Sequence, residues 1–216
     1  MPLLMLDLDN TLIDRDAAFR RWATSYVQTL GGSETDLRWL VEADRDGYEP
    51  REQLAAAIGR RFGLRETDAV LVELRLGMVD RIEMDPTVFE SLDRARSAGW
   101  SLVVVTNGTV SQQEHKLRAT GLDRHLDGWV ISEGVGLRKP DPRIFMAACQ
   151  LIGSQELVTS SWMIGDAAVH DVHGAQAVGA GGIWLHRGRR WPAEMDPPDH
   201  VASSFAGAVD VVLRSA

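Results

Sequence analysis

The stretch Asp7-Leu8-Asp9-Asn10-Thr11 follows the short apolar run Leu3-Leu4-Met5-Leu6 near the beginning of the chain. A short apolar run bounded by polar residues indicates a buried strand. Because Asp7 and Asp9 are two residues apart, their side chains point to the same side at the carboxyl end of that strand, where open α/β sheets bind ligands. Carboxylates this close repel each other unless a cation or a shared proton compensates. An acidic turn after a strand is also common without any function, so the rest of the chain decides between the two interpretations.

Two patterns divide the remaining sequence. Between Asp14 and Met84 apolar residues recur at helical spacing, which predicts a small bundle of four amphipathic helices. The last of these helices is expected to begin at Thr67 or Asp68 and to carry Leu71, Leu74, Met78 and Ile82 on one face. From Pro86 onward helices and strands alternate, which predicts a parallel sheet with helices on both faces.

We therefore expect an α/β fold. Residues 1–13 and 85–216 form a Rossmann-like, three-layer core with a parallel sheet, and residues 14–84 form an all-helical domain inserted after strand one. The expected later strands are Ser101–Thr106, Trp129–Ser132, Ser161–Ile164, Gly182–Leu185 and a last one near His200–Ser203. The expected helices between and before them are Pro86–Ala98, Val110–Thr120, Pro142–Ile152 and Val172–Val178, and a final helix follows at the C-terminus.

The composition of the 216 residues is ordinary for a globular protein, with 44% hydrophobic and 25% charged residues. A net charge of −8 argues against nucleic-acid or acidic-membrane partners. No apolar stretch approaches the roughly 20 residues of a membrane span. The single cysteine, Cys149, suits a reducing cytoplasm and is interpreted as a core residue. We expect a cytoplasmic protein, either a monomer or a homodimer, and interpret the basic cluster Arg187–Trp191 as a solvated loop.

Three further segments follow predicted strands. Thr106-Asn107-Gly108 offers a hydroxyl, an amide and backbone N–H groups before a helix, a combination that can bind an anion. Lys139 is one of only two lysines in a chain that otherwise uses arginine, which hints at a need for a compact point charge. Gly165-Asp166, followed by Asp171, comes after another apolar run. Each of these segments alone could be an ordinary turn.

In this order, the four segments resemble the motifs of the haloacid dehalogenase superfamily of phosphotransferases. The DxDxT motif corresponds to Asp7 through Thr11, the Thr/Ser motif to Thr106, the lysine motif to the stretch from Ile131 to Phe145, and the GDxxxxD motif to residues 165–171. The helical insertion sits where members with a helical cap carry that domain. The resemblance covers the whole predicted α/β portion.

The resemblance implies a role for each matching residue. Asp7 would be the nucleophile that forms an aspartyl-phosphate, and Asp9 the general acid and then the base. Mg²⁺ would be bound by Asp7 and Asp166 with the backbone carbonyl of Asp9, and Asp171 would hold metal-bound waters or the lysine. The remaining implied roles concern phosphate: Thr106 and the Asn107 backbone N–H would bind its oxygens, and Lys139 would neutralise charge on phosphate and nucleophile.

The second acid separates members of the superfamily. Dehalogenases act at carbon and lack the acid at the position of Asp9, so its presence implies phosphoryl transfer. Phosphonate-hydrolysing members use a cap lysine, and residues 14–84 contain none. The expected activity is a Mg²⁺-dependent phosphatase acting on a small phosphorylated metabolite. A phosphomutase remains an alternative, and a binding or regulatory module on the same fold is a third.

Two details concern the fine structure of the site. Ala167 and His170 stand where related sequences often have polar residues, which puts in question contacts around the metal ligand Asp166. In the insertion, the loop from Asp44 to Arg51 resembles the specificity loop of the family by position. Arg45, Tyr48 and Arg51 are therefore the candidate substrate selectors. Weaker candidates near the start of the insertion are Arg15, Arg20 and Arg21.

Overall fold

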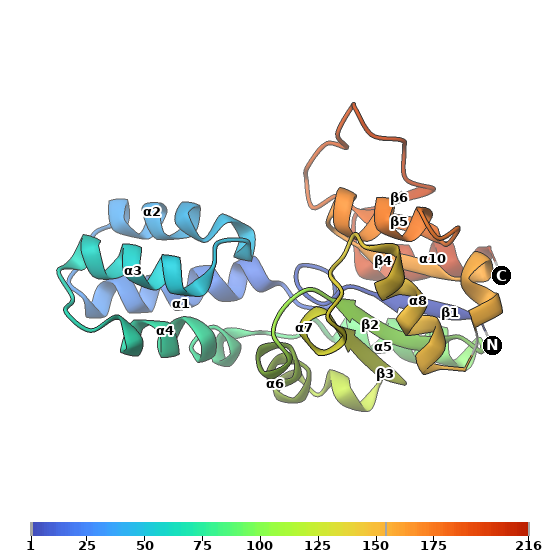
Figure 1. Ribbon diagram of the computed structural model, residues 1–216, viewed down its shortest axis with the longest axis horizontal. Helices are drawn as coiled ribbons and strands as arrows, with labels where there is room; N and C mark the ends of the chain where they lie inside the picture. Colours follow the sequence, from blue (N-terminus) through green and yellow to red (C-terminus); the bar gives the residue numbers. More distant parts are fainter. Residues whose placement is uncertain (1, 154, 216) are drawn as a thin grey trace. The chain divides into compact units, whose positions relative to one another are not determined.

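The computed structural model describes residues 2–153 and 155–215. The chain divides into two compact units (Figure 1). One is an α/β unit of Met1–Ile13 and Met84–Ala216, and the other is a helical unit of Asp14–Glu83. Met84, which the sequence pattern assigned to the insertion, therefore groups with the α/β unit.

The predicted parallel sheet is confirmed. Its six strands, all parallel, have the order β3-β2-β1-β4-β5-β6. Their bounds are β1 (Leu3–Leu6), β2 (Ser101–Thr106), β3 (Gly128–Ile131), β4 (Trp162–Gly165), β5 (Gly181–Leu185) and β6 (His200–Ala202). β3 ends one residue earlier than expected because Ser132 begins a short helix, α7 (Ser132–Val135), and its hydroxyl accepts a hydrogen bond from the Gly108 backbone at 3.0 Å.

The other helices of the α/β unit are α5 (Pro86–Ser97), α6 (Val110–Thr120), α8 (Pro142–Leu151), α9 (Gly174–Gln176) and α10 (Phe205–Arg214). Shorter turns are η3 (Leu122–Arg124), η4 (Gln155–Ser160) and the π-helical turn η5 (Ala168–His173). The helix expected at Val172–Val178 instead starts at Ala168 with this π-helical turn and ends with α9 at Gln176. Asp85 and Asp141 cap α5 and α8, and in both helices a proline occupies the first turn, where it needs no backbone partner.

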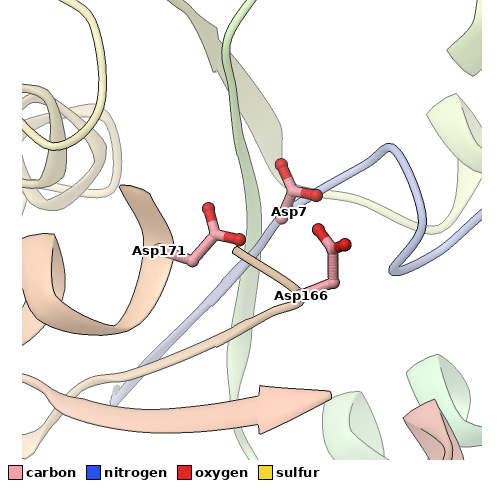
Figure 2. A group of neighbouring side chains, drawn as sticks. All are labelled: Asp7, Asp166 and Asp171. Atoms are coloured by element: carbon pink, nitrogen blue, oxygen red, sulfur yellow. The ribbon is translucent and has the colours of Figure 1, made fainter. Parts of the chain in front are cut away.

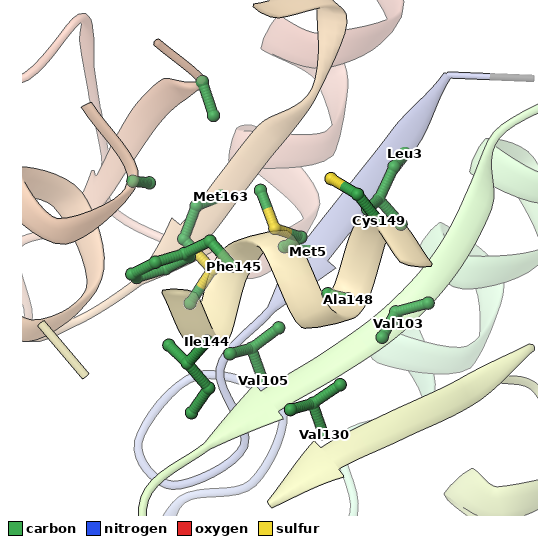
Figure 3. Packing of buried hydrophobic residues seen from close by; sticks show 12 residues of the cluster. Leu3, Met5, Val103, Val105, Val130, Ile144, Phe145, Ala148, Cys149 and Met163 are labelled. Carbon is green, nitrogen blue, oxygen red and sulfur yellow. The ribbon is translucent and has the colours of Figure 1, made fainter. Parts of the chain in front are cut away.

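The core of the α/β unit lies between the sheet and the helices. On one face, α8 packs Ile144, Phe145, Ala148 and Cys149 against alternate residues of β1, β2 and β3 (Figure 3). Cys149 is fully buried there, as predicted. The intervening strand residues are buried as well and point to the opposite face, since side chains alternate along a strand. There α10 contacts β4, β5 and β6, while α5 contacts β2 and α10.

The helical unit contains α1 (Arg15–Thr29), α2 (Glu34–Asp44), α3 (Arg51–Phe62) and α4 (Thr67–Leu76), with the turns η1 (Arg45–Gly47) and η2 (Val79–Arg81) (Figure 1). Its core includes Phe19, Trp22, Leu40, Leu54, Ile58 and Leu74. The last helix ends at Leu76, so Met78 and Ile82 lie beyond it, contrary to the expectation. Gly77 follows at a point where the Trp22 indole leaves no space for a side chain. None of the described helices is long and apolar enough to cross a membrane.

Candidate active site

The strand order has one topological switch point, which lies between β1 and β4. From β1 the sheet grows through β2 to β3 on one side and through β4 to β6 on the other. Ligands of open α/β sheets bind beyond the carboxyl ends of the strands at such a point. Asp7 directly follows β1, Thr106 ends β2 and Asp166 directly follows β4. Three of the four predicted segments therefore meet at this edge because of the topology alone.

Three carboxylates converge there. Oxygen atoms of Asp7, Asp166 and Asp171 all lie within 4.8 Å of one another (Figure 2). Asp171 comes from the turn η5, and its Oδ2 accepts a hydrogen bond of 2.8 Å from the backbone N–H of Ala167. A side chain at Gly165 would collide with the Asp171 carboxylate, so this approach requires glycine. The backbone of Ala167 thus supplies a contact that holds Asp171.

Lys139 lies against this cluster although it does not follow a strand. Its Nζ atom is 2.7 Å from Asp7 Oδ1, 2.7 Å from Asp171 Oδ1 and 2.6 Å from the carbonyl oxygen of Val105. The Asn107 side chain holds the lysine backbone at both polar groups, because Asn107 Oδ1 accepts from Lys139 N at 2.9 Å and Asn107 Nδ2 donates to Lys139 O at 3.1 Å. The Asn107 side chain therefore positions the lysine, a role that the sequence did not indicate.

The cluster has unbalanced charge. Burial, reinforced by the charges of Asp171 and Asp166, raises the pKa of Asp7 well above its ordinary value, even though Lys139 opposes the shift. Burial and the charge of Asp171 likewise raise the pKa of Asp166 to about 6. Burial favours the neutral amine of Lys139, but Asp171 and Asp7 outweigh it and raise the pKa of the lysine. Lys139 and the half-exposed Arg189 bring two positive charges to three carboxylates, so the arrangement favours a further cation with oxygen ligands.

Two hydroxyl groups adjoin the cluster. Thr11 Oγ1 donates a hydrogen bond of 3.2 Å to Asp7 Oδ2. Thr106, only 1% exposed, accepts a hydrogen bond of 2.7 Å at Oγ1 from Gln113 Nε2. A hydroxyl that accepts in this way keeps its proton for another acceptor. Thr106 can therefore donate to an anion at this sheet edge.

The Asp9 side chain does not join the carboxylate cluster. Lys116 Nζ lies 2.8 Å from its Oδ1 and 2.7 Å from its Oδ2. Gln113 Nε2 donates to Oδ2 at 3.0 Å. The sequence pattern did not indicate Gln113 or connect Lys116 with Asp9. The usable signals were the rarity of lysine and the three-residue spacing that places both side chains on one face of α6.

Arg189 is a further residue whose contact with the site the sequence did not indicate. Its guanidinium donates to Asp166 Oδ2 at 2.8 Å and to Asp166 O at 2.7 Å. Arg189 is about half exposed, as expected for a solvated loop, but it contacts Asp166, a member of the cluster. Trp191 of the same loop packs edge-on against Trp184 with ring centroids 5.1 Å apart.

Within the helical unit, the candidate substrate selectors have different environments. Arg51 pairs with Asp44 at 2.6 Å, and the buried Arg15 binds the same carboxylate, so both guanidinium groups hold the loop that follows α2. Arg45 is 71% exposed and Tyr48 is 52% exposed. Of the three predicted selectors, Arg45 and Tyr48 thus present their side chains to solvent.

Comparisons with known proteins agree with this architecture. The family model of haloacid dehalogenase-like hydrolases matches residues 1–179. A phosphoserine phosphatase from Thermus thermophilus is 30% identical, with 88% of this chain and 90% of that protein covered. A glyceraldehyde 3-phosphate phosphatase from Methanopyrus kandleri is 31% identical, with 99% and 97% covered. The structure of a magnesium-bound HAD hydrolase from Bacillus subtilis matches with a TM-score of 0.73 at 19% identity, covering 98% of both chains.

Proposed function

The chain belongs to the haloacid dehalogenase-like hydrolase family, and we propose that it is a Mg²⁺-dependent phosphatase that hydrolyses a small phosphorylated metabolite through an aspartyl-phosphate. The observation that carries the proposal is the position of Lys139, whose ammonium group lies 2.7 Å from both Asp7 and Asp171. A charge at this place can stabilise both a nucleophilic carboxylate and an incoming phosphate. Full-length similarity to two phosphatases supports the same reaction class.

Asp7 is the proposed nucleophile. It directly follows the central strand β1, Thr11 and Lys139 each bind one of its carboxylate oxygens, and it is 6% exposed. In the proposed reaction, these contacts would hold the carboxylate in place for in-line attack on phosphorus. The Thr106 hydroxyl, the Asn107 backbone N–H and Lys139 are the proposed phosphate ligands.

The donor set fits Mg²⁺. Asp7 and Asp166 would hold the ion with the backbone carbonyl of Asp9, and Asp171 would act through Lys139, which it contacts. When bound, Mg²⁺ supplies positive charge that lowers the repulsion between an anionic substrate and the carboxylates. The convergence of the carboxylates of Asp7, Asp166 and Asp171 within 4.8 Å supports this assignment.

Asp9 is the proposed proton carrier. As an acid it would protonate the leaving oxygen, and as a base it would then take a proton from the water that attacks the phosphoenzyme. Asp9 also argues against dehalogenation, because a halide leaving group needs no proton. A phosphomutase shares these residues, but water requires no second binding pose for a sugar phosphate. The presence of all the acids and Lys139 disfavours a purely regulatory module.

The helical unit is the proposed cap and the carrier of substrate selection. Its exposed loop residues Arg45 and Tyr48 are the proposed selectors, whereas Arg51 supports the loop through Asp44. We propose a cytoplasmic enzyme, monomeric or homodimeric, without nucleic-acid or membrane partners.

A phosphate-release screen tests the function. The purified protein is incubated with Mg²⁺ and a panel of sugar phosphates, nucleotides, phosphoglycolate, phosphoserine and glyceraldehyde 3-phosphate. Asp7→Asn is the test variant, and Asp93→Asn, which alters an exposed carboxylate on α5, is the matched control. We expect release by the wild type and the control and none by Asp7→Asn. Activity that survives Asp7→Asn would refute the mechanism, and retention of phosphate on a second sugar position would indicate a mutase.

A further inference from the structure

The second of the two lysines of this chain lies in a partly buried polar group next to the proposed catalytic centre. Lys116 is 7% exposed, and its Nζ atom contacts both carboxylate oxygens of Asp9 and, at 2.8 Å, Gln113 Oε1. Each of the two lysines therefore binds one acid of the Asp7–Asp9 motif. Lys139 pairs with Asp7, and Lys116 pairs with Asp9.

Gln113 connects this ion pair to the phosphate-binding segment. Its side chain is 2% exposed, and its amide nitrogen lies 3.0 Å from Asp9 Oδ2 and 2.7 Å from Thr106 Oγ1. Gly108 makes room for it, because a Cβ atom there would lie 2.9 Å from two side-chain carbons of Gln113. The glycine after Asn107 thus admits the amide that joins Thr106 to Asp9.

The helix geometry explains why two residues of α6 meet one carboxylate. Gln113 and Lys116 are three positions apart and therefore share a face of the helix. Thr109 caps the helix by accepting a hydrogen bond from Gln112 N, and Leu117 is fully buried next to the lysine. Both ends of the interacting segment are thereby fixed, so the lysine reaches Asp9 from a rigid support.

Resting on the proposed function, we propose that Lys116 is a positioning residue for Asp9, assisted by Gln113. It holds the Asp9 carboxylate in one orientation, connected through Gln113 to the Thr106 hydroxyl, so that the proton carrier and a phosphate ligand share one support. Stability alone is a weak reason for this pair, because the Asp9 side chain is 27% exposed and ion pairs that water reaches contribute little to stability. Orientation is a stronger reason, since catalytic groups act efficiently only when neighbouring contacts fix their geometry.

The test compares Lys116→Met and Lys116→Arg with Arg118→Met, an exposed control on the same helix whose side chain is 62% exposed. The first readout is the orientation of the Asp9 side chain in crystal structures of the full chain. The second is the rate of enzyme phosphorylation in a single turnover, measured with an alkyl phosphate and with p-nitrophenyl phosphate. An alkoxide leaving group needs a proton from Asp9, whereas p-nitrophenolate leaves without one.

We expect Lys116→Met to show several Asp9 rotamers and to lose about 10- to 100-fold in rate on the alkyl phosphate, with little change on p-nitrophenyl phosphate. Lys116→Arg should recover part of the alkyl phosphate rate. A single unchanged Asp9 orientation in Lys116→Met, or equal losses on both substrates, would overturn the proposal in favour of a structural role. If the wild type cleaves neither substrate, the proposed function fails, while the Asp9 orientation still decides the role of Lys116. If Lys116→Met does not fold, Lys116→Gln replaces it in both measurements.

Discussion

The Nζ atom of Lys139 lies 2.7 Å from Asp7 Oδ1, although 132 residues separate the two in sequence. The contact joins the residue that follows β1 to the loop before α8. Asn107 fixes the backbone of Lys139, and Asp171 and the Val105 carbonyl bind its ammonium group. The lysine is therefore held independently of any substrate. This relationship leads to the first prediction.

Lys139→Met should reduce both activity and stability. We expect phosphatase activity to fall by about 100- to 1000-fold, the usual effect of removing a group that stabilises developing charge. In EDTA the variant should also lose roughly 3–5 kcal/mol of unfolding free energy, because buried carboxylates lose their cationic partner. Added Mg²⁺ should restore part of that stability. Initial rates and urea unfolding with and without Mg²⁺ measure both effects.

The control for this prediction is Arg143→Met, which removes a cation that is 72% exposed at the start of α8. It should leave both quantities nearly unchanged. Wild-type stability of Lys139→Met in EDTA would show that the carboxylates do not depend on the lysine.

Asp9→Asn should separate the two chemical steps. With p-nitrophenyl phosphate, whose leaving group needs no proton, the variant should still become phosphorylated, but it lacks the base that activates water for the second step. The phosphoenzyme should therefore accumulate and appear as the mass of one added phosphoryl group after acid quenching. Asp7→Asn should never gain this mass. Turnover of Asp9→Asn at the wild-type rate would exclude Asp9 as the base.

Asp166→Asn should abolish metal binding and, with it, activity. In the wild type, EDTA should abolish activity, and Mg²⁺ should raise the melting temperature because it binds the folded state. The asparagine variant should lack both the activity and the Mg²⁺-dependent shift. Asp196→Asn, at an exposed position, is the matched control. An unchanged thermal shift in Asp166→Asn would place the metal elsewhere.

The same carboxylate predicts a pH dependence of metal binding. Burial and Asp171 raise the pKa of Asp166 to about 6, and a protonated carboxyl group does not bind Mg²⁺. As pH falls below this value, the apparent Mg²⁺ affinity should decrease by at least about tenfold per pH unit, because Asp166 and also Asp7, whose pKa is raised as well, must each lose a proton to bind the ion. Calorimetric titration at several pH values measures the slope. An affinity that does not change between about pH 5 and 7 would contradict the prediction.

The sequence predicted the parts of the site that strand ends position. Asp7, Thr106 and Asp166 were predictable neighbours, because the carboxyl ends of parallel strands lie at the same edge of the sheet. The contacts of Asp9 with Lys116 and of Asp166 with Arg189 were not predicted. They depend on how α6 and the loop after β5 pack against the sheet, and no local pattern encodes that packing. The π-helical turn η5 was not predicted either, because it also depends on packing. It places Asp171 against Gly165 and Lys139, where the sequence pattern predicted only a later, regular helix.

Asp44 gives the last prediction, which concerns the helical unit. The residue is 1% exposed, and its carboxylate binds Arg15 and Arg51 and accepts a hydrogen bond from the Gly47 backbone at 2.9 Å. These contacts hold a loop in which Arg45 and Asp46 adopt φ angles of 51° and 55°, a conformation that costs free energy in residues other than glycine. Asp44→Asn should therefore destabilise the helical unit by roughly 3–5 kcal/mol at neutral pH, because the buried Arg15 loses the carboxylate that binds both of its terminal nitrogens and keeps the longer contact with Asp16 at 3.5 Å.

The sign of the pH dependence follows from the direction of the shift. Burial would raise the pKa of Asp44, but the hydrogen bonds and charges of Arg15 and Arg51 outweigh it and hold the pKa below the ordinary value of 3.8. The stabilisation is therefore present above that value and is lost as the pH falls through the lower pKa of the folded state. The difference in unfolding free energy between wild type and Asp44→Asn should be constant near neutral pH and should shrink below about pH 4. Hydrogen exchange of the α1 and α3 amides measures it, with the exposed Glu42→Gln on α2 as the control. A difference that grows on acidification would mean that Asp44 is not held as a carboxylate by its two arginines.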